Sequence, residues 1–459
     1  MIITNSLRQY LLMILASIAV FLDYLDTSIV SIALPTISVD LGFGSFTAFW
    51  VMTSYLLALG STLLLFGKLA DRTRCEREIF TIGFVLFTLA SLLCGLSENI
   101  GMLISFRVFQ GVAAAMMVST ATMLITTRLP EGIRGIGMGV IATSGGVALA
   151  LGPGIGGVVT EFISWHWIFF INIPVGIVGI FLALFLIPKS EVRPCAKNPF
   201  DISGAILLAV TLISLLAGLE LGVSSGWTLP VFLILVITPV AGFLFIQREL
   251  SHPDPVLSAK LLLNRTVMWA SLSTLLITFV YLGVVYLMPF YLTGSYQMSV
   301  ALAGLVMLLA PVSMAFIGIP AGSLTGRFGC MHLCNTAAVL MAVGLLILVF
   351  SVILGCLPLL FAGLLLLGLG MGLNEGPSMQ RITVHSPLDM QGSSGGLIFT
   401  VMNIGCILGV AVFSVAASLG SGSSEVYNAH GVAIACIVGF MAAVCAYIAS
   451  LLARDQIRC

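Results

Sequence analysis

The chain has 459 residues, of which 59% are hydrophobic and only 8% are charged. A mean hydropathy of +1.18 excludes a soluble globular protein, which needs far more polar surface. The formal net charge is +0, and no Lys/Arg cluster resembles a nucleic-acid patch, so nucleic acid is not expected as a partner.

The apolar segments are long and continuous, which predicts membrane-spanning helices and excludes the short alternating strands of a barrel. A spanning helix needs about 20 apolar residues. On this criterion the sequence predicts an all-α polytopic membrane protein with fourteen spans. They are 10–34, 47–67, 79–96, 101–127, 135–160, 167–188, 202–221, 229–247, 266–292, 299–325, 333–354, 357–379, 392–418 and 431–453.

The basic residues predict the orientation of these spans. Of the 18 Lys and Arg residues, all but Arg107 lie in or next to the connections on one side of the predicted membrane. Basic connections stay on the cytoplasmic side. We therefore expect a multi-pass protein of the cytoplasmic membrane with both termini in the cytoplasm.

The connections also predict three regions. The inner segments 189–201 and 248–265 are the longest, and they bracket two spans, with six spans before and six after. This spacing indicates an N-terminal six-helix bundle (1–190), inserted helices with flanking loops (191–264) and a C-terminal six-helix bundle (265–459). A weak repeat, G-x-L-x-x-R at 67–72 and 322–327, occupies equivalent places in the two bundles.

Two charged residues are predicted to share a layer inside the membrane. Asp26 is eight residues from the outer end of its span, about 12 Å deep, and Arg107 is six residues from its outer end, about 9 Å deep. Ionisable groups at such positions are functional by default. We expect a proton-sensitive carboxylate whose charge Arg107 balances; the alternative is a static ion pair that fixes helix packing.

Two further acids lie in predicted spans. Asp23 is three residues before Asp26, on the same helix face, so the two would titrate as a coupled pair; alternatively, Asp23 is a polar lining residue of a wet cavity. Glu375 lies in a segment rich in Gly and Pro, about 7 Å from the predicted inner end of span 357–379. It could be a second proton site, a docking point for a cation, or an interfacial carboxylate that reaches cytoplasmic water.

Small residues are concentrated in the predicted span 135–160. Gly152, Pro153, Gly156 and Gly157 follow Gly139, Gly145 and Gly146, and so many glycines permit close helix packing. This packing could form a seal or hinge during transport, or a purely structural interface.

Several segments together resemble the major facilitator superfamily and its fourteen-helix drug:proton antiporter branch. The segments that carry the resemblance are Leu25–Val30 with Ala33–Pro35; Gly67, Leu69, Asp71 and Arg72; Arg107, Gln110 and Gly111; Gly152, Pro153, Gly156 and Gly157; and Trp165–Pro174. His166 stands where this branch usually has arginine, and Asp23 is an addition to its pattern.

The resemblance implies an alternating-access carrier. Asp71 and Arg72 would belong to an inner latch between helices, and Arg107 would help relay protons. The glycine motif of span 135–160 would mark export. No cofactor is implied.

The predicted function is proton-coupled export of lipophilic, cationic drugs or toxic compounds. Acids outnumber bases three to one inside the spans, which favours cations over anions as substrates. Asp23, Asp26 and Glu375 are the candidate substrate-binding residues, and Asp23, Asp26 and Arg107 the candidate proton-coupling residues. An exporter of a metabolite, amino acid or siderophore, and an uncoupled facilitator, remain alternatives.

The sequence has no catalytic constellation and no cysteine spacing typical of a metal site, so neither an enzyme nor a metal protein is expected.

Overall fold

A computed structural model describes residues 5–42, 45–188, 201–251, 261, 264–298, 300–387, 390–421 and 428–453. The first half contains seven helices: α1 (Asn5–Asp40), α2 (Ser45–Thr73), α3 (Glu76–Gly95), α4 (Ile100–Arg128), α5 (Glu131–Phe162), α6 (Trp167–Phe170) and α7 (Asn172–Leu186). Two helices follow, α8 (Ile202–Ser225) and α9 (Leu229–Ser251). The second half contains α11 (Arg265–Gly294), α12 (Val300–Met307), α13 (Leu309–Phe328), α14 (Cys330–Leu354), α15 (Leu357–Val384), α16 (Gln391–Ser421) and α17 (Ala429–Leu452).

Every predicted span coincides with helix. Thirteen helical segments in the described chain are long and apolar enough to cross a membrane, so this is a multi-pass membrane protein. Within α8 the apolar segment found is shorter, Ile206–Leu215, and the count of fourteen spans therefore stays a prediction. Most helices extend several residues beyond the predicted spans, because a helix continues into the interface after its apolar stretch ends.

Two predicted spans are each divided into two helices by a proline. Span 167–188 breaks between α6 and α7, four residues before Pro174, and span 299–325 breaks between α12 and α13, four residues before Pro311. A proline in a helix lacks an N–H donor and its ring clashes with the carbonyl four residues earlier. The breaks at Phe170 and Met307 follow from this rule.

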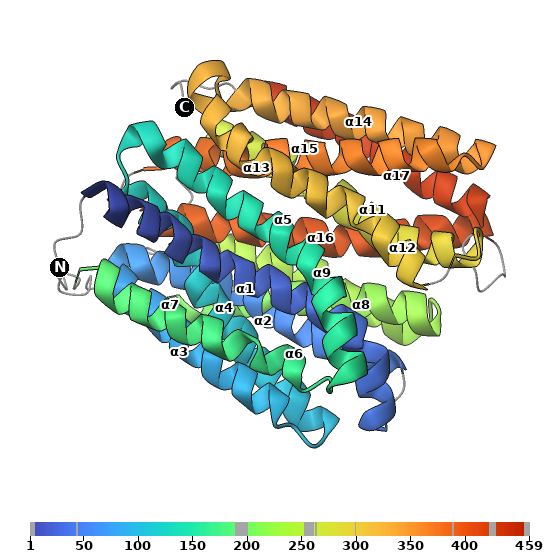
Figure 1. Cartoon of the computed structure of the whole chain (residues 1–459), viewed down its shortest axis with the longest axis horizontal. Helices are drawn as coiled ribbons and strands as arrows, with labels where there is room; N and C mark the ends of the chain where they lie inside the picture. The colour runs from blue at the N-terminus through green and yellow to red at the C-terminus, as the bar shows by residue number, and fades with distance from the viewer. Residues whose placement is uncertain are drawn as a thin grey trace.

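The helices pack in two groups that lie side by side (Figure 1). In the first, α1 packs on α5, and α4 packs on α2 and α3; in the second, α14 packs on α15 and α17, and α11 packs on α16. The two groups meet along α5 with α13 and along α2 with α16. The residue limits predicted for the three regions stay predictions.

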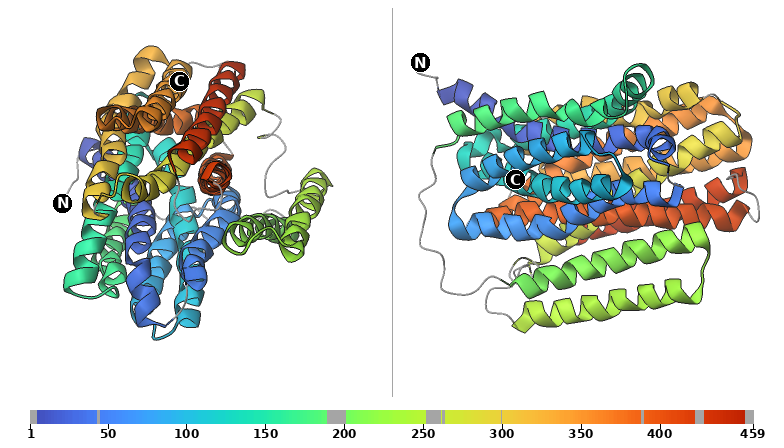
Figure 2. Two further views of the ribbon diagram at one scale, coloured as in Figure 1. Left: turned by 90° about the vertical axis from the view of Figure 1, so that its right-hand side faces the viewer. Right: turned by 90° about the horizontal axis from the view of Figure 1, so that it is seen from below.

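Helices α8 and α9 form a hairpin at the side of these groups, as both views in Figure 2 show. The two helices pack against each other, and α8 also packs on α2 and α16. At the end where α8 begins, Asp201 accepts hydrogen bonds from the backbone N–H of Gly204 and from Nε of Arg248, at 3.0 and 3.1 Å. An ion pair and a helix cap therefore close this end of the hairpin.

The two halves are in close contact at the end of the bundle where α5 begins and α13 ends, hereafter the basic end, where Arg134 and Arg327 lie. A Cβ atom at Gly322 would lie only 2.3 Å from the carbonyl oxygen of Gly135 and 2.9 Å from Cα of Gly139. A Cβ at Gly395 of α16 would lie 2.7 Å from the carbonyl oxygen of Ser119. Glycines on both sides thus let the backbones meet, and the basic end is closed.

Candidate functional site

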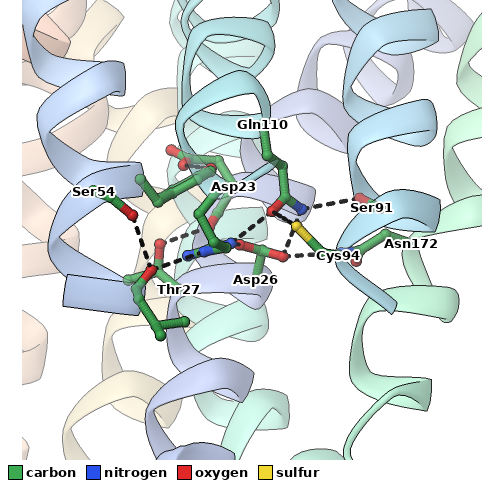
Figure 3. A network of polar contacts seen from close by, with 11 residues as sticks. Asp23, Asp26, Thr27, Ser54, Ser91, Cys94, Gln110 and Asn172 are labelled. Atoms are coloured by element: carbon green, nitrogen blue, oxygen red, sulfur yellow. Dashed lines mark hydrogen bonds and ion pairs between the residues drawn. The ribbon is translucent and has the colours of Figure 1, made fainter. Parts of the chain in front are cut away.

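A buried polar network occupies the interior of the first half, where α1, α2, α3, α4 and α7 converge (Figure 3). Its centre is an ion pair between Asp26 of α1 and Arg107 of α4, both 0% exposed. Nε2 of Gln110 and Nδ2 of Asn172 donate hydrogen bonds to Oδ1 of Asp26, at 2.9 and 3.0 Å. The structure therefore brings the two residues together in one layer, as their predicted depths require.

Arg107 has several further partners. Its Nε donates to the carbonyl oxygen of Val51 at 3.0 Å, and its Nη1 donates to Oε1 of Gln110 at 2.7 Å. The guanidinium carbon also lies 4.2 Å from the ring centre of Tyr55, a cation–π geometry. These contacts hold a charge whose isolated burial would be costly, and they make Gln110 part of the charge network as well as of its sequence motif.

Asp23 lies one helical turn before Asp26 and has a different partner. The hydroxyl of Tyr55 donates a hydrogen bond to its Oδ1 at 2.5 Å, and the residue is 7% exposed. Tyr55 therefore links the two acids: its hydroxyl donates a hydrogen bond to Asp23, and its ring packs on Arg107, the partner of Asp26. The two carboxylates share a helix face, as predicted, but one is paired with a cation and the other with a neutral hydroxyl.

Glu375 lies apart from this network and deeper than predicted. Because α15 continues to Val384, Glu375 is nine residues, roughly 14 Å, from the helix end, and it is 0% exposed. The burial argues against a carboxylate that reaches cytoplasmic water. Its Oε1 accepts a hydrogen bond of 3.3 Å from the hydroxyl of Tyr24 in the other half. Asp23 and Asp26 thus belong to one site and Glu375 to another. The two sites are connected through α1, where Tyr24, the partner of Glu375, follows Asp23.

The predicted latch residue Asp71 contacts the second half at the basic end. Its Oδ2 accepts a hydrogen bond from the backbone N–H of Ser393 at 2.6 Å, in the first turn of α16. The unpaired N–H groups and positive dipole of a helix N-terminus favour a carboxylate there. Arg72 follows Asp71 near the end of α2, and Gly67 is buried four residues earlier. The contact adds a polar tie to the closed basic end.

The motif glycines differ in what surrounds them. A Cβ at Gly152 would lie 2.3 Å from Oγ of Ser28, one at Gly156 would lie 2.9 Å from Cγ1 of Ile29, and one at Gly111 would lie 2.4 Å from the carbonyl oxygen of Tyr55. At Gly157 nothing lies within 4 Å. The first three therefore permit close helix contacts, whereas Gly157 does not. Pro153 lies within α5, but its side chain is outside the described part of the structure.

This difference makes a prediction with an internal control. Replacing Gly152 with alanine should destabilise the contact between α1 and α5 by about 1–3 kcal/mol, because the added methyl group overpacks it. Gly157→Ala, in the same helix, should leave stability and transport near the wild-type values. Thermal unfolding of the detergent-solubilised variants, followed by an efflux assay, measures both effects. Equal loss in the two variants would contradict this role for Gly152.

His166, which stands where the antiporter branch usually has arginine, packs against its neighbours at the end of the first half opposite the basic end. The imidazole stacks on Trp165, with ring centres 3.7 Å apart, and its Nδ1 lies 2.7 Å from Oγ of Ser164. The indole N–H of Trp165 donates to Asp40 at 2.7 Å. The position has a local packing role, and it lies outside the network around Asp26.

Sequence reasoning missed the neutral partners of the charges. Tyr24 and Tyr55 belong to no motif, and only the folded structure brings them to the acids. Asn172 lies in the segment Trp165–Pro174 that carried part of the family resemblance, so its position in that segment was a usable signal. Ser91, which accepts a hydrogen bond from Gln110 at 2.9 Å, had none.

Comparison with known proteins agrees with this architecture. Residues 16–410 match the Major Facilitator Superfamily. The riboflavin transporter RibZ of Clostridioides difficile (strain 630) is 33% identical over 409 residues, 89% of this chain and 88% of that protein. The tetracenomycin C resistance and export protein of Streptomyces glaucescens is 31% identical over 418 residues, 89% of this chain and 76% of that protein.

The fold comparison gives the same result. The crystal structure of the human organic anion transporter MFSD10 (TETRAN) matches with a TM-score of 0.69 and 16% identity, covering 97% of this chain and 99% of that one. The predicted fold class is confirmed, and relatives named for resistance and export agree with the predicted branch. The chain therefore belongs to the Major Facilitator Superfamily.

Proposed function

We propose that the protein is a proton-coupled antiporter that exports lipophilic organic cations. The observation that carries the proposal is the pair of neighbouring carboxylates on α1, of which Asp26 forms an ion pair with Arg107 and Asp23 accepts a hydrogen bond from the hydroxyl of Tyr55. A membrane interior disfavours charge. Two acids with such unlike partners are suited to hold and release a proton without exposing an unpaired charge.

In the proposed cycle, protonation of the Asp23/Asp26 pair weakens its attraction for Arg107 and reduces the negative charge that favours a cationic substrate inside the carrier. The loss of that attraction would release the substrate outward and favour the return of the empty carrier. One proton exchanged for one monovalent cation moves no net charge, so the pH gradient drives that exchange, and each additional proton that enters gains about 2.3 kcal/mol per 100 mV of membrane potential. The proton gradient can therefore drive export against a concentration gradient. The pair acts as one titrating unit.

A second candidate function is export of a defined metabolite. The 33% identity with a protein named as a riboflavin transporter favours a flat, polar, uncharged ring system as an alternative substrate. The relative named for tetracenomycin C also points to polycyclic compounds. We also propose the topology of the carrier. It lies in the cytoplasmic membrane with both termini in the cytoplasm, and it is divided into the regions 1–190, 191–264 and 265–459.

The test is efflux from proteoliposomes that contain the purified protein. A panel with ethidium, tetraphenylphosphonium and riboflavin is loaded, and a pH gradient is imposed in either direction. Antiport of cations predicts that efflux of the first two follows the gradient and reverses with it. Efflux of riboflavin alone would select the metabolite exporter, and flux that ignores the gradient would select a facilitator.

A further inference from the structure

The carboxylate of Glu375 is the least compensated acid in the described interior. Oε1 has one long hydrogen bond, 3.3 Å from the hydroxyl of Tyr24. Among the described residues no hydrogen-bond partner reaches Oε2, and none of the ion pairs found there includes Glu375. Both polar side-chain atoms of the neighbouring residue Asn374 also lack hydrogen-bond partners in that part of the chain.

Tyr24 covers this carboxylate from the first half. Its ring lies beside α5, 3.4 Å from where a Cβ of Gly145 would be, and its hydroxyl reaches α15. Tyr24 is partly exposed, whereas Glu375 is 0% exposed. Tyr24 therefore covers Glu375 on the side that faces the first half.

A carboxylate in such a place has two stable conditions. Burying an ionised carboxylate without a partner costs several kcal/mol, so the group is either neutral or bound to a cation. Asp26 meets the second condition with Arg107. Among the described residues Glu375 has no cation of its own, but it has an oxygen without a partner, and two tyrosines, Tyr24 and Tyr281, lie nearby.

We propose that Glu375 is the subsite for the positively charged group of the substrate, with the hydroxyl of Tyr24 occupying its place in this conformation. A quaternary ammonium, phosphonium or protonated amine displaces that hydroxyl, pairs with the carboxylate and packs on the tyrosine rings, which attract organic cations. The inference rests on the proposed function. It assigns proton binding to the first half of the protein and binding of the substrate's cationic group to the second half.

The position of Tyr24 explains how the two sites communicate. Asp23 and Tyr24 are consecutive residues of α1, and they bind Tyr55 of the first half and Glu375 of the second, respectively. A cation that releases Tyr24 from Glu375 frees a segment of α1 that also carries the proton site. The coupling is local and needs only a rotation or shift of α1 at this point.

The experiment measures equilibrium binding of tetraphenylphosphonium to the purified full chain in detergent by calorimetry. Glu375→Gln should weaken binding by about tenfold or more, because the coupling energy of a close, desolvated charge pair exceeds the energy of one decade in affinity. Tyr24→Phe should strengthen binding, since the cation no longer competes with a hydroxyl. Glu161→Gln, at an exposed carboxylate near the end of α5, is the matched control and should bind like the wild type.

The outcomes separate this proposal from the one before it. Equal affinity of the wild type and Glu375→Gln, with both eluting as a single folded species, would overturn the subsite, as would an absence of binding to the wild type. Weaker binding by Glu375→Gln combined with wild-type efflux that ignores a pH gradient would leave the subsite standing and remove proton coupling. A Glu375→Asp variant that retains part of the affinity would support the role of the charge.

Discussion

Replacement of Asp26 with asparagine is expected to abolish efflux driven by a pH gradient. The variant keeps the size and one hydrogen-bond acceptor of the side chain but cannot bind and release a proton. It also leaves Arg107 buried without a counter-charge, which costs about 3–5 kcal/mol for such pairs. Efflux of ethidium from proteoliposomes and thermal unfolding of the same preparation measure the two effects.

A second variant separates the loss of coupling from the loss of stability. Asp26→Asn combined with Arg107→Gln removes both charges, so it should recover most of the thermal stability and still lack gradient-driven efflux. Glu98→Gln, at an exposed carboxylate just before α4, should behave like the wild type. Normal gradient-driven efflux by the double variant would remove the pair from the mechanism.

Replacement of Gly322 with alanine is expected to open the basic end. The added methyl group would lie 2.3 Å from the carbonyl oxygen of Gly135 and 2.9 Å from Cα of Gly139, and backbone atoms cannot rotate away. Overpacking of about 1–3 kcal/mol changes the ratio of two conformations by a factor of roughly 5 to 150. The closed arrangement should lose population, and transport should slow because the cycle needs both states.

Spin labels at positions 131 and 328, which lie at the basic end on α5 and α13, report this opening in a background without native cysteines. The distance between the labels should increase in Gly322→Ala. Gly326→Ala lies one turn later in α13, where no atom comes within 4 Å of the added carbon, and it carries the same gain in helix propensity. Identical distances in the two variants would show that Gly322 does not control closure.

The fold could be predicted from the sequence because a membrane permits few kinds of spanning structure. Each span must satisfy its own backbone hydrogen bonds, so apolar length alone located helices such as α4 and α14. The breaks before Pro174 and Pro311 were not predicted, although the clash between a proline ring and the carbonyl four residues earlier explains both. The motif resemblance also led to the correct superfamily.

The candidate site could be predicted from the sequence only in part. The depths of Asp26 and Arg107 predicted a shared layer because helix rise is regular. The partners Tyr55 and Tyr24 were not predictable, since contacts between side chains of different helices depend on rotation about each axis, which a fully apolar span does not reveal. The depth of Glu375 was underestimated for a different reason, because α15 continues to Val384, past the apolar residues that set the predicted end of the span.

The hairpin of α8 and α9 has a consequence for how a lipophilic molecule approaches the carrier. Because α8 packs on both α2 and α16, it screens one of the two seams between the halves from acyl chains. The opposite seam, between α5 and α13, has no such screen among the described helices. A molecule dissolved in the bilayer therefore meets two unlike seams, one covered by α8 and one formed by α5 and α13 alone among the described helices.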